Sequence, residues 1–290
     1  MKYFLLLILV LAVNADFIEN TINKANKRAT TWVTTTLEEN QFKDWTESDI
    51  KKMLGFIPDN AISTSNHAIS YKVPSHFDQR EEWKHCNQQI YDQGGCGSCW
   101  SFAVNSAVDY RRCIHKGELL NLSEQQLVSC DSSNNGCRGG QLPSAFYYHA
   151  EDGVVKEEFY PYKSGDDGLD HTCEIKHITA DHYYMDGDSI DTIYGNREAI
   201  QTEIMKNGPV ATGFYVYEDF LAYKGGIYQR KSSHFMGGHA VVIIGWGLED
   251  GIGYWICKNS WGASWGEHGY FRIAFGECQI ENFVTFGLPK

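Results

Sequence analysis

The residues after position 73 divide into a half patterned for helices and a half patterned for strands. Apolar residues three and four positions apart at 99–114 predict a helix that begins near Cys99. Ser123 is placed as an N-cap with Gln126 three residues later, so we expect a capping box at the start of a second helix. The second half contains β-branched and aromatic runs bounded by glycines, near residues 208–217, 237–247, 253–261 and 269–276. A helical lobe followed by a strand-rich lobe is an α+β protein, and we expect its site in the groove between the lobes.

The N-terminus has the pattern of a secretory signal. Met1 and Lys2 precede an unbroken apolar run at 3–13, and a plausible cleavage site ends at Ala15. The run is shorter than the roughly 20 residues that a membrane span needs. We therefore expect residues 1–15 to be a signal peptide. The protein would then be soluble and destined for a lysosome, another acidic vesicle or the extracellular space.

Residues 16–72 differ in amino-acid composition from the rest of the chain. They contain no cysteine and are rich in Asn, Thr, Lys and Glu, with scattered aromatic residues. We expect short helical or extended structure with a weak core of its own. A segment of this kind, between a signal and a cysteine-rich domain, suggests a pro-segment that is cut near Lys72 and Val73. A flexible linker or a small separate module are the alternatives.

The charge of the chain argues against polyanionic partners. The sequence has 25 Lys and Arg residues against 37 Asp and Glu residues. It has no basic tract or stripe of the kind that binds nucleic acid or anionic membranes. Neither of these is therefore expected as a partner.

The sequence CGSC at 96–99 allows three interpretations. A zinc site needs a second pair of ligands, yet the chain has no other C-x-x-C pair and no H-x-x-x-H pair. A thioredoxin-type redox motif follows a strand in a βαβ-containing domain, whereas a polar stretch ending in glycines precedes this one. The third interpretation is a structural cysteine beside a reactive one. Cys99 lies at the expected start of a helix, where free N–H groups and the helix dipole lower the pKa of a thiol; the plainer alternative is a buried cysteine.

Four segments in the same order resemble the papain-like cysteine proteases: QGGCGSCWSF, SEQQLVSCDSSNNGCRGG, GGHAVVIIGWG and YWICKNSWGASWGEHGYFRI. The resemblance spans about Val73 to Lys290, and it is strongest to cathepsin B in VPSHFDQREEWKHC, NKRATTW and MGGHAVVIIGWG. It implies a papain-like two-lobe fold, with a helical lobe at about 84–180 and a strand-rich, barrel-like lobe at about 181–290. It also implies a monomeric cysteine endopeptidase without cofactor or metal. Its partners would be protein and peptide substrates and its own pro-segment, which acts as an inhibitor.

The resemblance assigns a role to each catalytic position. Cys99 would be the nucleophile, His239 its base and later the acid for the leaving amine, and Asn259 the residue that orients the imidazole. Gln93 would offer its side-chain N–H, beside the backbone N–H of Cys99, to the oxyanion. Trp261 would cover the hydrogen bond between Asn259 and the imidazole. The substrate-binding residues implied by the resemblance are Gly139, Gly140, Trp261 and Phe283.

The nine cysteines are odd in number, so at least one thiol is unpaired. Spacing alone leaves the connectivity open. By the resemblance, three are expected to be free, with Cys257 inert in an apolar strand. His234 is the nearest rival of His239, but it lies in a polar stretch. The pairs implied by the resemblance are Cys86 with Cys113, Cys96 with Cys137, and Cys130 with Cys173; Cys99, Cys257 and Cys278 remain.

Two departures from cathepsin B bear on specificity. Cathepsin B carries a long insertion with an adjacent histidine pair, which closes one end of the groove and makes the enzyme trim C-terminal dipeptides. Between Cys137 and Cys173 this chain has only His149 and His171, so we expect an endopeptidase. The segment ECQIENF places Phe283 where cathepsin B has a glutamate in the pocket for the second residue upstream of the scissile bond. We therefore expect that pocket to be apolar and shallow.

A non-enzymatic binding or structural protein is the alternative function, because some protease-like proteins have lost their catalytic residues. Here all four catalytic positions are filled. If the chain is a zymogen, acidification adds protons to its 11 histidines and its carboxylates. We expect this to weaken the charge contacts between the pro-segment and the enzyme, and so to favour activation at low pH.

Overall fold

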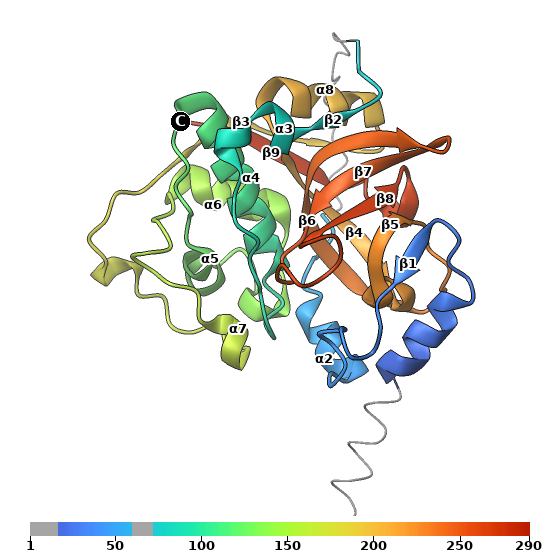
Figure 1. The fold of residues 1–290 in the computed structure, drawn as a ribbon. Helices are drawn as coiled ribbons and strands as arrows, with labels where there is room; N and C mark the ends of the chain where they lie inside the picture. The colour runs from blue at the N-terminus through green and yellow to red at the C-terminus, as the bar shows by residue number, and fades with distance from the viewer. Residues whose placement is uncertain (1–16, 60–71) are drawn as a thin grey trace, which may run out of the picture.

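The computed structural model describes residues 17–59 and 72–290. The signal peptide predicted at 1–15 lies outside the described residues. A helical lobe and a strand-rich lobe lie side by side, and α4 runs between them (Figure 1). The helices are one at residues 17–26, α2 (Glu47–Met53), α3 (Gln79–Glu82), α4 (Cys99–Lys116), α5 (Glu124–Cys130), α6 (Leu142–Glu151), α7 (Ser164–Asp167) and α8 (Arg197–Asn207).

The strands form one sheet that is open at both ends. Its order is β1-β5-β8-β7-β6-β4-β9-β3, with the short β2 paired to β6, and only the β5–β8 pair is parallel. No strand pairing joins β1 to β3 among the described residues, so the lobe is a curved open sheet, and the barrel-like shape expected from the sequence is not closed. The strands are β1 (Trp32–Thr34), β2 (Phe77–Asp78), β3 (Met185–Ile193), β4 (Val210–Tyr217), β5 (Tyr223–Tyr228), β6 (Phe235–Glu249), β7 (Ile252–Lys258), β8 (Tyr270–Ala274) and β9 (Val284–Pro289).

The helix α4 is the structural axis between the lobes. It begins at Cys99, as predicted, and ends at Lys116; the C-cap Gly117 has a φ of 75°, in the left-handed region that favours glycine. Most of its residues are buried on every side, because α4 packs against α5 and α6 on one flank and against β6 and β9 on the other. The first turn of α4, which begins with Cys99, therefore lies where the two lobes meet.

Only half of the capping box predicted for α5 forms. The Ser123 hydroxyl accepts a hydrogen bond from the Gln126 backbone N–H at 3.0 Å. The Gln126 side chain does not return to the N-cap; its amide donates to the Gly153 carbonyl at 2.8 Å and its oxygen accepts from the Val155 N–H. A tertiary partner thus replaces the local one, since the loop at 153–155 offers buried groups that need hydrogen bonds.

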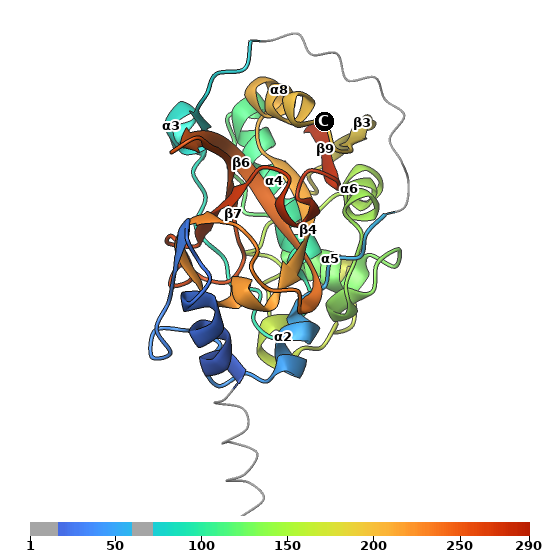
Figure 2. The same cartoon turned by 90° about the vertical axis from the view of Figure 1, so that its right-hand side faces the viewer.

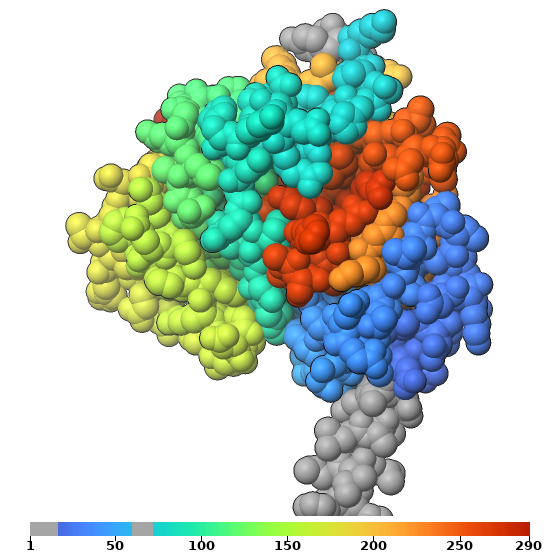
Figure 3. All heavy atoms as spheres, in the orientation of Figure 1, coloured from blue at the N-terminus to red at the C-terminus, as the bar shows by residue number. Residues whose placement is uncertain are grey.

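The N-terminal segment, defined here as residues 17–59, has no separate core. Its buried apolar residues up to Leu54 belong to the same cluster as those of the strand-rich lobe, and Phe56 belongs to the cluster around α4 and α6. Trp32 packs 5.3 Å from Tyr228, and Phe42 packs edge-on at 5.3 Å from Trp261 (ring centroids). The sequence-based expectation of a weak core of its own is therefore wrong, because the aromatic side chains of this segment are long enough to complete the core of the lobe that it covers (Figure 3).

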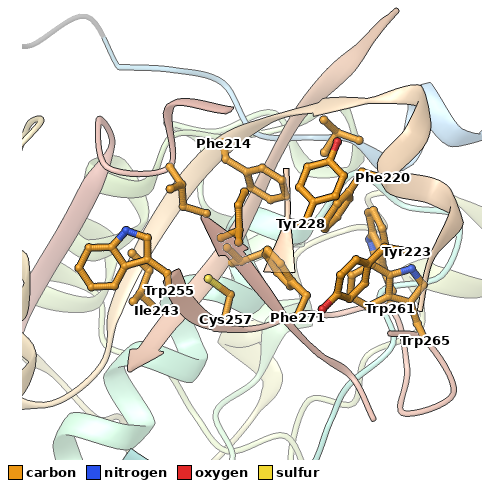
Figure 4. Packing of buried hydrophobic residues seen from close by; sticks show 14 of the residues in the cluster. Phe214, Phe220, Tyr223, Tyr228, Ile243, Trp255, Cys257, Trp261, Trp265 and Phe271 are labelled. Atoms are coloured by element: carbon orange, nitrogen blue, oxygen red, sulfur yellow. The ribbon is translucent and has the colours of Figure 1, made fainter. Parts of the chain in front are cut away.

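Aromatic rings fill the centre of the strand-rich lobe (Figure 4). Phe220 contacts Trp261 at 5.7 Å, Trp265 at 5.2 Å and Phe271 at 5.0 Å between ring centroids. Cys257 is a fully buried free thiol within this packing, and burial raises its pKa well above the ordinary value. Trp261 and Trp265, which follow β7, are part of this packing, and Trp261 contacts His239 on β6.

The helical lobe and its loops are held by three disulfides. They are Cys86–Cys113, Cys96–Cys137 and Cys130–Cys173, the pairs implied by the resemblance, and Cys99, Cys257 and Cys278 are free. Among the described residues, none of the helices is both long enough and apolar enough to cross a membrane.

Candidate active site

The thiol of Cys99 lies at the N-terminal end of α4 and is fully buried. Ser98 makes no side-chain cap, so the first N–H groups of the helix are free to face the sulfur. The backbone N–H groups of Ala240, Gly55 and Trp100 face it and act to lower its pKa. Ala240 directly follows His239 on β6, so the fold brings the nucleophile candidate of one lobe against the base candidate of the other.

The imidazole of His239 is oriented by Asn259, the residue that follows β7. The His239 Nε2 lies 2.7 Å from the Asn259 Oδ1. Because an amide oxygen only accepts, Nε2 carries the proton and Nδ1 is the basic nitrogen. The indole of Trp261 lies over the imidazole, with 4.6 Å between ring centroids and 33° between ring planes. Both neighbours are buried, so water does not compete for the Asn259 hydrogen bond.

The Gln93 side chain is a fully buried donor between the N-terminal segment and the residue after Asn259. Its Nε2–H donates to the Met53 carbonyl and to the Cys96 carbonyl, each at 2.9 Å. Its Oε1 accepts from the Ser260 hydroxyl at 2.8 Å, which fixes the orientation of the amide. Sequence reasoning predicted Gln93 but missed Ser260. Its position directly after Asn259 in the segment KNSW was the available signal.

After α2 ends at Met53, residues 54–57 of the N-terminal segment cross the site, and Gly55 and Phe56 form β-bridges there. The Phe56 N–H donates to the Gly238 carbonyl at 3.0 Å, and the Ile57 N–H donates to the Gly140 carbonyl at 2.9 Å. The Gly140 N–H in turn donates to the Gly55 carbonyl at 2.8 Å. These bonds join the segment to both lobes at once, in parallel register with each, so a peptide backbone occupies the groove.

The glycines on both sides of this passage allow the backbones to approach closely. A Cβ added to Gly55 would lie 1.8 Å from the Gly97 carbonyl oxygen. Gly139 has a φ of 112°, and a Cβ there would lie 2.5 Å from the Gly55 carbonyl oxygen. Only glycine fits at such positions. Sequence reasoning missed Met53, Gly55 and Phe56, since a single glycine between apolar residues carries no distinct pattern.

The covered site keeps the thiol and the imidazole neutral. Burial raises the pKa of Cys99 to about 11, although the neighbouring N–H groups oppose the rise. Burial lowers the pKa of His239 to about 4, against the opposing hydrogen bond of Asn259. The lowered thiol pKa expected from the helix position is therefore wrong for this form of the chain, because the N-terminal segment removes the water that would solvate a thiolate.

Phe283 lines the pocket that receives Phe56. The two rings are 5.2 Å apart between centroids, and Tyr215 approaches Phe283 from the other side at 5.9 Å. The remaining wall consists of Leu142, Pro143, Thr192, Ile193, Tyr194, Asn282 and Thr285, with Asp59 at the N-terminal segment's side. Asp59 belongs to the N-terminal segment. The residues of 72–290 that line this pocket include no carboxylate.

The other histidines considered from the sequence lie elsewhere. His234 is partly exposed and contacts Glu47 and Glu218 at the edge of the N-terminal segment. His149 is buried in α6, where its Nε2 bonds the Asn105 side chain at 2.8 Å. His171 lies in a loop beside Asp167, with 3.3 Å between ring nitrogen and carboxylate. Their different partners show that His149 and His171 do not form a pair.

Comparisons with known proteins agree with this arrangement. The model of the family described as "Papain family cysteine protease" matches residues 73–288. The chain belongs to the papain family of cysteine proteases. Among curated relatives, "Cathepsin B-like CP3" of Giardia intestinalis is 38% identical over 85% of this chain and 86% of that protein. "Cathepsin B" of Dictyostelium discoideum is 33% identical over 98% of both.

The solved structures that are similar to this chain include precursor forms of proteases. The structure of "proCathepsin B S9 from Trypanosoma congolense" aligns with a TM-score of 0.83 at 27% identity, covering 94% of this chain and 98% of that one. The proform of the ragweed pollen protease Amb a 11 aligns with a TM-score of 0.80 at 30% identity, covering 96% and 88%. The chain is thus a cathepsin B-like cysteine protease of the papain family with the two-lobe α+β fold.

Proposed function

We propose that residues 73–290 form a cysteine endopeptidase that is made as a zymogen. Residues 16–72 would be its inhibitory pro-segment, and residues 1–15 a signal peptide that directs it to the secretory pathway. The observation that carries the proposal is the passage of residues 53–57 over Cys99, with the Met53 carbonyl hydrogen-bonded to Gln93. The similarity to precursor structures supports this assignment, and the family match that begins at residue 73 supports the boundary.

The chemistry follows from the geometry once the groove is free. Nδ1 of His239 accepts the thiol proton of Cys99, and the thiolate attacks the peptide carbonyl carbon. The oxyanion accepts hydrogen bonds from the side chain of Gln93 and the backbone N–H of Cys99; one such donor is worth about 2.7 to 4 kcal/mol. The C–N bond then breaks as the imidazolium protonates the leaving amine, and water hydrolyses the thioester with His239 as the base.

We propose cleavage within long chains because the groove would be open at both ends once the N-terminal segment is removed. Beyond Cys99, the space between the lobes is covered by α2, which borders a cavity of ≈ 650 Å³ against residues 165–170. Figures 1 and 2 both show α2 at the end of α4 where the lobes meet. Removal of α2 with the pro-segment would leave room for a substrate to continue on both sides of Cys99.

The proposed function is tested by digesting a peptide of about 20 residues with the activated protein and identifying products by mass spectrometry. Internal cuts are expected early in the reaction. Release of C-terminal dipeptides alone would contradict the endopeptidase assignment. The alternative of a non-enzymatic protein is tested by a covalent thiol-protease inhibitor, which labels Cys99 only if the thiol is reactive.

Phe283 is expected to set a preference for apolar residues at the second position upstream of the scissile bond. A guanidinium buried in this pocket without a carboxylate partner would cost several kcal/mol, on the order of a 100-fold loss. Reporters with Val-Arg or Leu-Arg should therefore give a higher kcat/KM than Arg-Arg. Phe283→Glu should reverse the order, and Phe283→Gln is the control for size and polarity without charge. A higher kcat/KM for Arg-Arg in the wild type would contradict the prediction that an apolar pocket at Phe283 selects this residue.

Glu218 is expected to set the pH of activation. It accepts from Lys24 at 2.9 Å and from Thr21 at 3.1 Å, and His234 lies 3.4 Å away. Burial opposes ionisation, but the hydrogen bonds and charge of Lys24 outweigh it and hold the pKa of Glu218 below its ordinary value. A lowered pKa stabilises the covered form above about pH 4.5 and loses that contribution as the pH falls further.

The measurement is the pH at which half of the precursor is processed in a fixed time. Glu218→Gln removes the charge at similar size, and it should move this pH upward by at least about half a unit. Glu249→Gln serves as the control, because Glu249 pairs with Arg272, away from the N-terminal segment. Equal processing curves for Glu218→Gln and the wild type would show that this contact does not govern activation.

A further inference from the structure

Lys258 is a buried cation next to the catalytic candidates that the chemistry above does not use. It is the last residue of β7, and Asn259 follows it directly. Its side chain points to the helical lobe, where the Nζ donates to the Gln88 Oε1 at 2.6 Å and to the Ser106 Oγ at 3.2 Å. The residue is only 3% exposed, although lysine is among the residue types that are almost never fully buried.

The partners of Lys258 connect it to the helix that carries Cys99. Ser106 is on α4, seven residues after Cys99, which is close to two turns and about 10 Å along the axis. Gln88 completes the junction, because its Nε2 donates to the Ser106 carbonyl at 2.9 Å. Lys258 therefore links the end of β7, which Asn259 follows, to α4, which begins with Cys99.

Aromatic rings and carboxylates partly offset the cost of burying the ammonium group. The Nζ lies 4.8 Å from the ring centroid of Tyr91 and 5.4 Å from that of Tyr110. Burial lowers the pKa of Lys258 to about 7, while the buried carboxylates of Glu124 and Asp109 act in the opposite direction. Buried charges are often replaceable by apolar residues without loss of stability, so stability alone is a weak reason for this one.

We propose that Lys258 is a positioning residue for the reaction, which holds Asn259 and its imidazole in register with the thiol at the N-terminus of α4. The inference rests on the proposed function. Asn259 bonds the His239 Nε2 at 2.7 Å, so a displacement of the end of β7 moves the imidazole relative to Cys99. A misplacement of about 1 Å can cost on the order of 100-fold in rate.

The test uses Lys258→Met, made in the full chain and activated by an added protease, so that slow self-processing does not affect the comparison. We expect kcat to fall between about 10-fold and about 100-fold, with KM changed less than about twofold. The rate of alkylation of Cys99 by iodoacetamide should fall in parallel, because fewer molecules hold the thiol and imidazole in contact. A role in folding alone would lower the melting temperature and leave both rates unchanged.

Arg111→Met is the matched control. Arg111 is the other fully buried cation on this interface; it joins α4 to the strand-rich half through Pro209 at 2.8 Å, Gly208 at 3.0 Å and Gly287 at 3.1 Å. It also pairs with Glu203 at 2.9 Å. It lies twelve residues after Cys99, about 18 Å along the helix. Its replacement should lower the melting temperature without changing kcat per active site.

A milder variant covers the case in which Lys258→Met does not fold. Ser106→Ala removes one partner of the ammonium and keeps a good helix former. It should lower kcat by roughly threefold to tenfold, and less than additively in combination with Lys258→Met. The inference is overturned if either folded variant retains the wild-type kcat and alkylation rate. If the wild type itself neither cleaves peptides nor reacts with iodoacetamide, the proposed function fails instead.

Discussion

Replacing Cys99 by alanine is expected to reduce kcat by about 10⁶-fold, the scale seen when a protease loses its nucleophile. The sulfur faces the backbone N–H groups of Ala240, Gly55, Trp100 and Cys99 itself, and alanine removes only this one atom. The melting temperature should therefore stay near that of the wild type. The measurement is hydrolysis of a fluorogenic peptide by preparations matched in protein concentration and activated by an added protease.

The control for this result is His239→Ala, which should lose nearly as much, because the thiol and imidazole act as a unit. The double variant should be no slower than either single variant. Cys257→Ala is the second control: it removes a free buried thiol of the core and should leave kcat unchanged. Wild-type rates in a folded Cys99→Ala protein would show that another residue is the nucleophile.

Gly55→Ala in the unprocessed precursor is expected to increase the reactivity of Cys99 by roughly 100-fold or more. A Cβ at this position would lie 1.8 Å from the Gly97 carbonyl oxygen, so residues 54–57 must move away from the groove. While they remain, burial holds the pKa of Cys99 at about 11. At pH 7 this corresponds to about 10⁻⁴ of the thiol as thiolate, against about 3% for an unperturbed thiol of pKa 8.5.

The measurement is the rate of iodoacetamide alkylation at pH 7, with mass spectrometry to confirm that the precursor is intact. Lys43→Ala provides the control, since Lys43 is an exposed residue of the same segment away from the groove. The control and the wild-type precursor should both react slowly. An intact wild-type precursor that is fully active at neutral pH would rule out the zymogen assignment altogether.

Several parts of the site could be predicted from the sequence because they depend on local order along the chain. Cys99 could be placed at a helix start from the apolar spacing at 99–114, and the structure begins α4 there. The resemblance of four segments to the papain-like proteases predicted Gln93, His239 and Asn259 as a set; in the structure Gln93 bonds Ser260, next to Asn259, and Asn259 bonds His239. The three disulfides also agree with that resemblance.

Contacts between residues that are distant in the chain could be found only in the tertiary structure. The side chain of Gln126 satisfies groups near residue 153 in place of its own N-cap, and the apolar residues of 17–59 complete a core formed mainly after residue 200. The protonation of the site is the clearest case. A helix N-terminus by itself favours a thiolate at Cys99, but Gly55 and its neighbours exclude water, and the desolvation of a charge outweighs the attraction of a few N–H dipoles. The sequence therefore determined which groups could react, whereas the packing of the N-terminal segment determined that they are held neutral in this form.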